Sequence, residues 1–164
     1  MVPALDDDGF MLYESRAMIR YLDAKLAGVS LTPADLRARA RMDQWMSVES
    51  SYFSPPAMKA IMNIWYSSMA GKQRGPEVVA QGVQGAGKAL DVVEKKLGDK
   101  AFIAGDFSLA DICYAPYLQY LQDMGLGAVI TERPKVAAWW TRVSGRPSWQ
   151  KAIGTSWQKA IGKA

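Results

Sequence analysis

The sequence predicts a mainly α-helical protein that begins with one short β-hairpin. Two short apolar segments flank the acidic turn Asp6–Gly9, and an Asp-Gly turn in that setting is typical of a hairpin. From Leu31 onward, apolar residues recur at helical spacing between proline and glycine punctuation. The chain has 164 residues, of which 49% are hydrophobic, so it can bury one core of ordinary size.

The hairpin is predicted from the segments Val2–Leu5 and Phe10–Tyr13, and a helix follows it at once. Glu14 and Ser15 open this helix, whose apolar residues include Met18 and repeat at helical spacing. A hairpin of this size is only marginally stable alone. Strands this short at the first residue of a chain normally continue a sheet that began earlier, so we expect the hairpin to be the end of a larger sheet.

Three long helices are expected next. Thr32 is expected to cap the first, with Pro33 in its first turn, and this helix should run toward Phe53 before Pro55-Pro56 kinks or ends it. The second run is Ala57–Met69 and stops at the glycine that follows. The third run begins at Pro76 and closes at Gly98.

Three glycines, Gly82, Gly85 and Gly87, lie inside the third of these helices. Each costs about 1 kcal/mol relative to alanine in a helix interior. Close packing against another helix and local looseness both explain them, and the pattern does not choose between the two.

A second signature predicts a well-capped helix that begins after Ser108. Ser108 and Asp111 have the spacing of a capping box, in which each side chain bonds the backbone amide of the other residue. Such a box marks a helix start and carries no catalytic duty by itself, so we assign Ser108 and Asp111 to folding. Pro116 lies inside the same helix and should bend it.

The start of the chain resembles a known family. Val-Pro, an acidic turn and then Leu-Tyr-Glu-Ser-Arg-Ala-Met-Ile-Arg-Tyr-Leu is similar to the end of the thioredoxin-like domain of cytosolic glutathione transferases, most closely the phi class and its bacterial relatives. The resemblance implies glutathione as co-substrate. It implies that Val2 and the cis proline Pro3 pair with the cysteinyl part of glutathione, and that Glu14 and Ser15 hold its γ-glutamyl end.

Elementary chemistry agrees with that implication. Ser15 at a helix start presents a hydroxyl and free backbone N–H groups to a carboxylate, while Glu14 can accept hydrogen bonds from an α-ammonium group. The alternative is a plain helix start without a ligand. In the family, a serine or tyrosine nearer the N-terminus stabilises the thiolate of glutathione, and no residue here corresponds to it. We therefore expect no catalytic residue in this chain and little or no activity from it alone.

The resemblance continues through the capping box and through Glu132–Trp139 and Arg146–Trp149 to about Gly154. It implies three parts: residues 1–28 as the remnant of a thioredoxin-like, glutathione-binding domain, residues 29–154 as an all-helical C-terminal domain, and residues 155–164 as a duplicated tail. The tail is so named because the sequence of residues 148–154 recurs at 156–162. Two copies are too few for a solenoid.

In the family, an apolar co-substrate binds among the helices present here. The candidates for that hydrophobic pocket, chosen by alignment and aromatic character, are Trp45, Tyr52, Phe53, Tyr117 and Tyr120. The alternative is that these aromatic residues simply belong to the core, which is the commoner fate of aromatic residues at helical spacing.

Composition excludes several function classes. The chain has no histidine and one cysteine, Cys113, so zinc sites, histidine-based catalysis and an internal disulfide framework are not expected, nor is any metal. The net charge of +4 comes from basic residues spread along the chain, so we expect no nucleic-acid partner. The apolar runs are too short to span a bilayer. We expect a cytoplasmic protein that forms a homodimer, as family members do.

Three functions remain open at this point. The chain is a glutathione transferase that conjugates glutathione to apolar electrophiles, truncated and weak or inactive as it stands. Alternatively, it is a non-catalytic helical module that keeps the apolar pocket and binds ligands, or a structural domain that mediates assembly.

Overall fold

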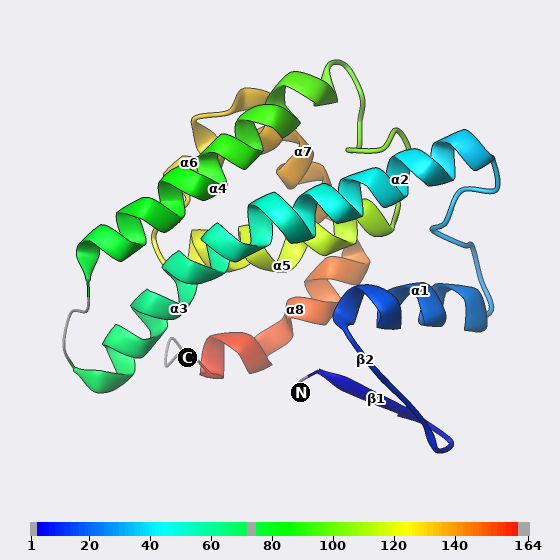
Figure 1. Cartoon of the computed structure of the whole chain (residues 1–164), viewed down its shortest axis with the longest axis horizontal. Helices are drawn as coiled ribbons and strands as arrows, with labels where there is room; N and C mark the ends of the chain where they lie inside the picture. Colours follow the sequence, from blue (N-terminus) through cyan, green and yellow to red (C-terminus); the bar gives the residue numbers. More distant parts are fainter. Residues whose placement is uncertain (1–2, 72–74, 161–164) are drawn as a thin grey trace.

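The computed structural model describes residues 3–71 and 75–160, with side chains as far as Ile153. Its elements are β1 (Ala4–Asp7), β2 (Phe10–Tyr13), α1 (Ser15–Lys25), α2 (Leu36–Val48), the π-helical segment η1 (Glu49–Phe53), α3 (Ser54–Ala70), α4 (Pro76–Leu97), α5 (Leu109–Asp123), α6 (Ala128–Thr131), α7 (Pro134–Ser144) and α8 (Pro147–Ala160). The predicted fold class, a helical bundle preceded by a hairpin, is confirmed (Figure 1).

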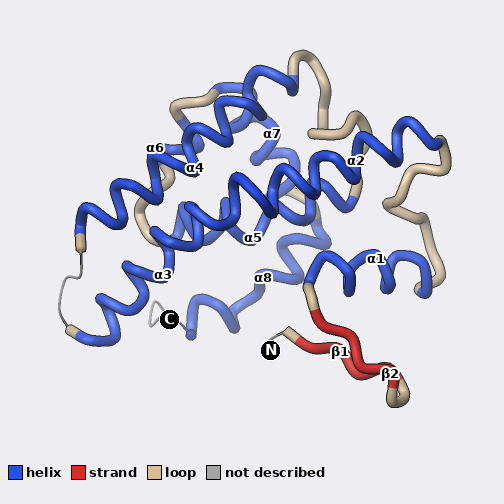
Figure 2. Tube along the Cα trace, in the orientation of Figure 1, coloured by secondary structure: helices blue, strands red, loops and turns tan. Residues whose placement is uncertain are grey.

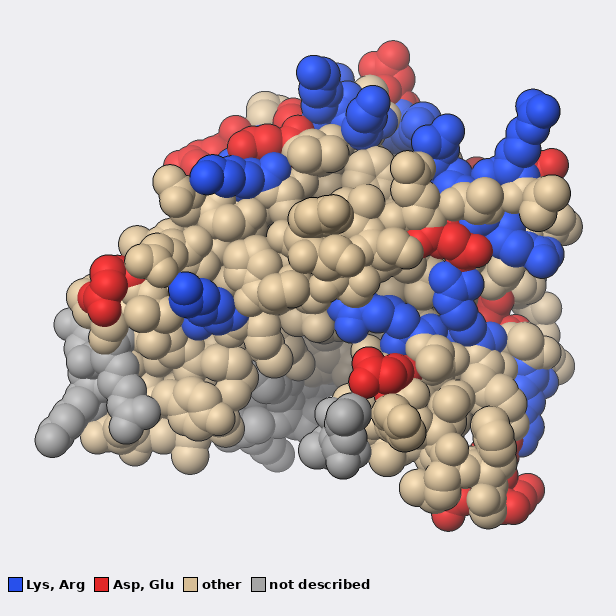
Figure 3. All heavy atoms as spheres, in the orientation of Figure 1, with Lys and Arg blue, Asp and Glu red and all other residues tan. Residues whose placement is uncertain are grey.

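The hairpin is a two-stranded antiparallel sheet in which Ala4 pairs with Tyr13 and Leu5 with Leu12. Its turn residues Asp8 and Gly9 have positive φ angles of 52° and 87°, the conformation that hairpin turns with the right twist require. The hairpin lies beside α1 (Figure 2), where the Asp7 carboxylate accepts from Tyr21 and Lys25 and the ring centroids of Phe10 and Tyr21 are 5.4 Å apart. Acidic side chains gather at the outer end of the hairpin (Figure 3).

The loop between α1 and α2 places the helix start later than predicted. Asp35, not Thr32, is the N-cap of α2, and its side chain accepts a hydrogen bond of 2.9 Å from the amide of Ala38. The loop before it is fixed by Asp23, which accepts from the amide of Leu31 at 2.7 Å and from the Ser30 hydroxyl at 2.9 Å. The prediction of Thr32 as cap was wrong because both residue types can cap and only the loop geometry selects between them.

The expected break at Pro55-Pro56 is a change of helix type, not a gap. The segment η1 joins α2 to α3 as one long rod (Figure 1), and the amide of Ser54 donates to the carbonyl of Glu49, five residues earlier. Pro55 and Pro56 lie in the first turn of α3, where their missing N–H groups leave the preceding carbonyls without helical partners.

Helix α5 occupies the centre of the bundle and packs against α2, α3 and α7. The core combines large side chains from all of these helices, among them Met42, Phe53, Tyr114, Leu118 and Trp139, each fully buried.

Two of the interior glycines of α4 are explained by close packing. A Cβ at Gly82 would lie 2.8 Å from both the Cβ of Ala60 and the carbonyl oxygen of Pro56. A Cβ at Gly85 would lie 2.7 Å from the Cβ of Pro56. Real Cβ atoms do not approach this closely, so α3 and α4 touch here only because both positions lack side chains. Close packing, not looseness, accounts for these two residues.

The capping box at the start of α5 is present, and it extends into a larger buried network. Asp111 accepts from the amide of Ser108 at 2.9 Å, from the amide of Ile103 at 3.0 Å and from the indole Nε1 of Trp139 at 2.8 Å. Asp111 is fully buried, and burial raises the pKa of its carboxyl even though these bonds oppose the rise. Asp111 therefore joins the start of α5 to α7.

The two copies of the tail repeat meet in a single helix. Helix α8 begins in the first copy, where Trp149 packs edge-on against Trp140 at a centroid distance of 6.0 Å. Its backbone continues into the second copy as far as Ala160, and the end of that copy lies outside the described residues.

Candidate functional site

A pocket of about 330 Å³ lies between α1, α3, α5 and the residue just before β1. It is of the size that holds a small ligand. Its lining is mostly apolar, with Ile19, Met58, Ile112, Cys113 and Pro116 contributing the apolar and sulfur-bearing side chains. The polar side chains of the lining are Ser15 and Arg16 on α1 and Tyr117 and Tyr120 on α5, and Pro3 completes it.

Two of the four residues predicted to bind glutathione line this pocket, namely Pro3 and Ser15. Ser15 is the first residue of α1, so the free amides of a helix start adjoin it. Glu14 precedes it and is exposed, outside the pocket lining. Val2 lies outside the described residues.

The backbone of Glu14 adopts a conformation that non-glycine residues rarely take, with φ 71° and ψ 106°. Its carbonyl nevertheless accepts from the amides of Ala17 and Met18, both at 2.9 Å, and so starts the first turn of α1. Such strain costs of order 1–3 kcal/mol and is concentrated at functional sites. The strained backbone of Glu14 therefore indicates that the turn before α1 has a conformation that costs stability and is typical of functional sites.

The predicted aromatic residues separate into three environments. Tyr117 and Tyr120 line the pocket. Trp45 and Phe53 belong to the core, where the Phe53 ring stacks on that of Tyr114 at 5.0 Å. Tyr52 is 68% exposed and faces away from both. The structure thus brings only the two tyrosines of α5 together with Pro3 and Ser15.

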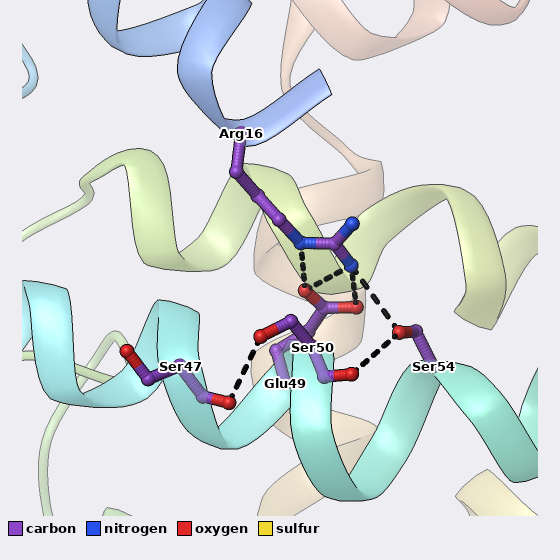
Figure 4. Close-up of polar contacts among 5 residues, drawn as sticks. All are labelled: Arg16, Ser47, Glu49, Ser50 and Ser54. Atoms are coloured by element: carbon purple, nitrogen blue, oxygen red, sulfur yellow. Dashed lines mark hydrogen bonds and ion pairs between the residues drawn. The ribbon is translucent and has the colours of Figure 1, made fainter. Parts of the chain in front are cut away.

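An ion pair that includes the pocket residue Arg16 joins α1 to the junction of α2 and α3 (Figure 4). Arg16 Nε donates to Glu49 Oε2 at 2.8 Å, and Arg16 Nη2 lies 2.7 Å from Oε1 and 2.5 Å from Oε2. Nη2 also reaches the hydroxyl of Ser54 at 3.3 Å. Glu49 is fully buried, while 26% of the Arg16 side chain is exposed. This pairing fixes the side chain that follows Ser15 directly.

At both Glu49 and Arg16, burial and the partner's charge shift the pKa in opposite senses. Burial raises the pKa of Glu49, and the hydrogen bonds from Arg16 and Ser54 oppose that rise. For Arg16, burial is the largest single effect and acts to lower the pKa, but the hydrogen bonds and negative charge of Glu49, together with Tyr117, outweigh it and the net shift is upward, so the guanidinium stays charged.

Sequence reasoning missed Glu49 and Arg16, although a signal for Glu49 existed. Glu49 stands four residues after Trp45 and four before Phe53, so it lies on the helical stripe that becomes buried. A carboxylate on a buried stripe requires a cationic or hydrogen-bonding partner. The spacing alone could not name that partner, because Arg16 is 33 residues away.

Cys113 contributes a thiol to the pocket wall and is 8% exposed. Burial, with a further contribution from the negative charge of Glu49, raises the pKa of this thiol to about 12. It is therefore protonated near neutral pH and is a poor nucleophile there.

The pocket has the chemistry of a site for a molecule with one polar and one apolar end. Ser15 contributes a hydroxyl at a helix start, Arg16 interacts with Tyr117 beside it, and the aliphatic side chains contribute the apolar wall. Within residues 3–71 and 75–160, no group of three or more His, Cys, Asp or Glu side chains could hold a metal ion. The same stretches contain no helix long and apolar enough to cross a membrane.

Comparison with known proteins shows what this arrangement is similar to. The family model "Glutathione S-transferase, C-terminal domain" matches residues 46–147. Glutathione S-transferase F11 of Arabidopsis thaliana is 36% identical over 156 residues, which are 93% of this chain and 73% of the relative. A glutathione S-transferase of Hyoscyamus muticus is 38% identical over 155 residues, with the same two coverages.

Solved structures agree with the sequence relatives. The apo structure of glutathione S-transferase III superposes with a TM-score of 0.88 at 34% identity, covering 94% of this chain and 73% of that one. Glutathione S-transferase I bound with lactoylglutathione superposes with a TM-score of 0.85 at 32% identity, covering 92% and 73%. The chain therefore belongs to the glutathione S-transferase family.

Proposed function

We propose that this chain takes part in conjugating glutathione to apolar electrophiles, as a phi-like member of the family, of bacterial type, with a role in detoxification. The observation that carries the proposal is that Pro3, Ser15, Tyr117 and Tyr120 line the same pocket. Val2, Pro3, Glu14 and Ser15 would bind glutathione, which is the co-substrate, and no metal is needed. The apolar compound would lie against the two tyrosines.

Each of the proposed contacts has a physical basis. The γ-glutamyl carboxylate suits the Ser15 hydroxyl and the free amides at the start of α1, where the helix dipole favours a negative charge. The exposed carboxylate of Glu14 suits the α-ammonium group. Arg16 does not contact glutathione in this proposal; its bonds to Glu49 hold the first turn of α1 in place.

We further propose that the chain alone has little conjugating activity. Stabilising a thiolate near neutral pH needs a hydroxyl directed at sulfur. Ser15 is assigned to the γ-glutamyl end, and Cys113 is a protonated thiol with no such role. The remaining assignments follow the resemblance: residues 1–28 as the end of a thioredoxin-like domain, 29–154 as the helical domain, 155–164 as a duplicated tail, a homodimer, and a cytoplasmic location.

Calorimetric titration with S-hexylglutathione tests the proposal, because this molecule carries both ends of the expected ligand pair. We expect binding by the unaltered chain, with affinity reduced about tenfold in Ser15→Ala and in Tyr120→Ala, since each removes contacts at one end. Ser51→Ala, an exposed serine outside the pocket, is the matched control.

Unchanged affinity in both Ser15→Ala and Tyr120→Ala would contradict the site. A standard conjugation assay on the same samples tests the activity separately. Binding without turnover is the expected result, and turnover comparable to that of a full-length relative would refute the proposal of weak activity. Loss of such turnover in Ser15→Ala would show that Ser15 activates the thiol.

A further inference from the structure

Tyr117 is the polar side chain of the pocket whose position the structure explains most fully. It lines the pocket together with Arg16, and Arg16 interacts with it. Its ring packs edge-on against that of Phe53 at a centroid distance of 6.1 Å. Phe53 and Glu49, which binds Arg16, are both fully buried residues of η1. The segment η1 therefore holds Tyr117 twice, through the ring of Phe53 and through the guanidinium of Arg16.

The guanidinium of Arg16 is held firmly on one side. Its Nε and Nη2 donate to the carboxylate of Glu49, and Nη2 also reaches the hydroxyl of Ser54 (Figure 4). These bonds do not use Nη1. A planar fork that is held through two of its nitrogens presents the third in a fixed direction, so little of its freedom remains to be lost when that nitrogen binds a partner.

The interaction between Arg16 and Tyr117 has a defined polarity. A guanidinium has donors and no acceptor, so the tyrosine oxygen accepts from Arg16 and the phenolic proton stays available for another partner. The positive charge beside the oxygen also polarises the O–H group and makes it a stronger donor. Much of the lining is formed by apolar side chains, so the Tyr117 hydroxyl is a directed donor on a largely apolar wall.

We propose that Tyr117 makes this pocket prefer apolar electrophiles that carry an uncharged oxygen acceptor, such as a nitro or carbonyl group. This rests on the transferase function proposed above and names the substrate class of that site. Tyr117 donates its phenolic proton to the acceptor oxygen, while Arg16 and Glu49 are positioning residues that act through it. An electrophile without such an oxygen leaves the donor unpaired, and its binding is weaker by the contribution of that hydrogen bond.

The probes are 1-nitronaphthalene and 1-methylnaphthalene, which are similar in size, because only the nitro compound has an acceptor and neither needs glutathione. Ligand-observed NMR titration of the full chain measures the affinity for each probe. In Tyr117→Phe, which removes only the hydroxyl, the ratio of the affinity for the nitro probe to that for the methyl probe should fall by about threefold to tenfold. Tyr66→Phe, an exposed tyrosine on α3 outside the pocket lining, is the matched control and should leave this ratio unchanged.

The positioning role of Arg16 is tested with Arg16→Lys, which keeps the charge but loses the fork that serves Glu49 and Tyr117 at once. The ratio of the two affinities should fall by a similar factor. The double variant that combines Arg16→Lys with Tyr117→Phe should show no further fall, because both residues act on one hydrogen bond. A merely structural role of Arg16 would weaken the binding of both probes equally and leave the ratio unchanged. Thermal melting of each variant establishes that it is folded.

An unchanged ratio in Tyr117→Phe would overturn the proposal, as would failure of the unaltered chain to bind either probe. An unchanged ratio in Arg16→Lys would overturn the positioning role. Titration with S-hexylglutathione separates this proposal from the transferase function. If S-hexylglutathione binds but the ratio is unchanged in Tyr117→Phe, only the substrate preference fails. If S-hexylglutathione does not bind but the ratio still falls, only the glutathione site fails.

Discussion

The N-terminal region, residues 3–28, and the helical bundle are held in different ways. Helix α1 contributes no buried residue, and its contacts with the bundle include two ion pairs, from Arg16 to Glu49 and from Arg20 to Asp43. The bundle is instead stabilised by a continuous apolar core. Apolar burial is strong but undirected, whereas a bidentate ion pair fixes orientation. The pocket lined by Pro3, Ser15, Tyr117 and Tyr120 lies where the two regions meet. Its geometry therefore depends on the ion pairs of α1, which are weaker but more directional than the apolar core.

The largest expected effect belongs to the bundle. Asp111→Ala should lower the free energy of unfolding by about 3 to 5 kcal/mol, because it leaves two buried amides and a buried indole without an acceptor and removes a helix cap. Ser108→Ala, which touches only the cap, should cost about 0.5 to 2 kcal/mol. Urea unfolding of the two variants provides the measurement. Equal costs would mean that the network beyond the cap contributes nothing.

The second-largest expected effect concerns the Arg16–Glu49 ion pair, which joins the N-terminal region to the helical bundle. Glu49→Ala should cost about 2 to 3 kcal/mol, because it removes the buried carboxylate and leaves Arg16 only partly solvated. Affinity for S-hexylglutathione should fall with it, since the first turn of α1 loses its anchor. Stability and affinity are measured on the same preparation. A loss of stability with full affinity would separate the ion pair from the pocket.

Removal of the exposed ion pair between Arg20 and Asp43 should have a smaller effect on stability. Arg20 and Asp43 lie 2.6 Å apart, and 41% of each side chain is exposed. Exposed pairs contribute about 0 to 1 kcal/mol and are screened by salt. Arg20→Ala should therefore change stability by less than 1 kcal/mol, and the change should shrink in 1 M salt. A cost as large as that of Glu49→Ala would show that exposure does not distinguish the two pairs.

The smallest expected effect concerns pH. Because burial raises the pKa of Cys113 to about 12, its contribution to stability is constant below the unfolded value of about 8.5 and is lost as pH rises toward 12. Alkylation of the native protein by iodoacetamide should therefore be far slower than that of the urea-unfolded chain at neutral pH and should keep rising without a plateau up to about pH 10, whereas the rate for the unfolded chain should level off above its pKa of about 8.5. Parallel pH profiles in the two states would show that Cys113 is exposed.

The sequence predicted best the features that depend on neighbours along the chain. Helix α4 begins at Pro76 and ends before Gly98 as predicted, because proline and glycine act through the local backbone. The capping box at Ser108 is equally local. The start of α2 was misplaced at Thr32 because the side chain of Asp23, from a preceding helix, fixes the loop.

The sites were harder to predict because they depend on tertiary packing. Phe53 and Tyr117 are both aromatic residues on helices, yet one is in the core and the other lines the pocket. Which way each faces depends on how α1, α3 and α5 pack, and helical spacing does not contain that information. The pairing of Arg16 with Glu49 and the close approach of Gly82 to Ala60 also depend on tertiary packing.

The π-helical segment η1 changes the rotation of α3 about the helix axis relative to α2. Each residue of an α-helix turns the chain by about 100°, so one residue accommodated in a wider turn changes the face that every later residue presents. Helix α2 therefore packs against α5, while α3 packs against both α4 and α5. At the point of change, Glu49 and Phe53 point inward and Tyr52 outward. The buried faces of α2 and α3 therefore differ in direction, and the change occurs at η1, which begins with Glu49, the residue that binds Arg16 of α1.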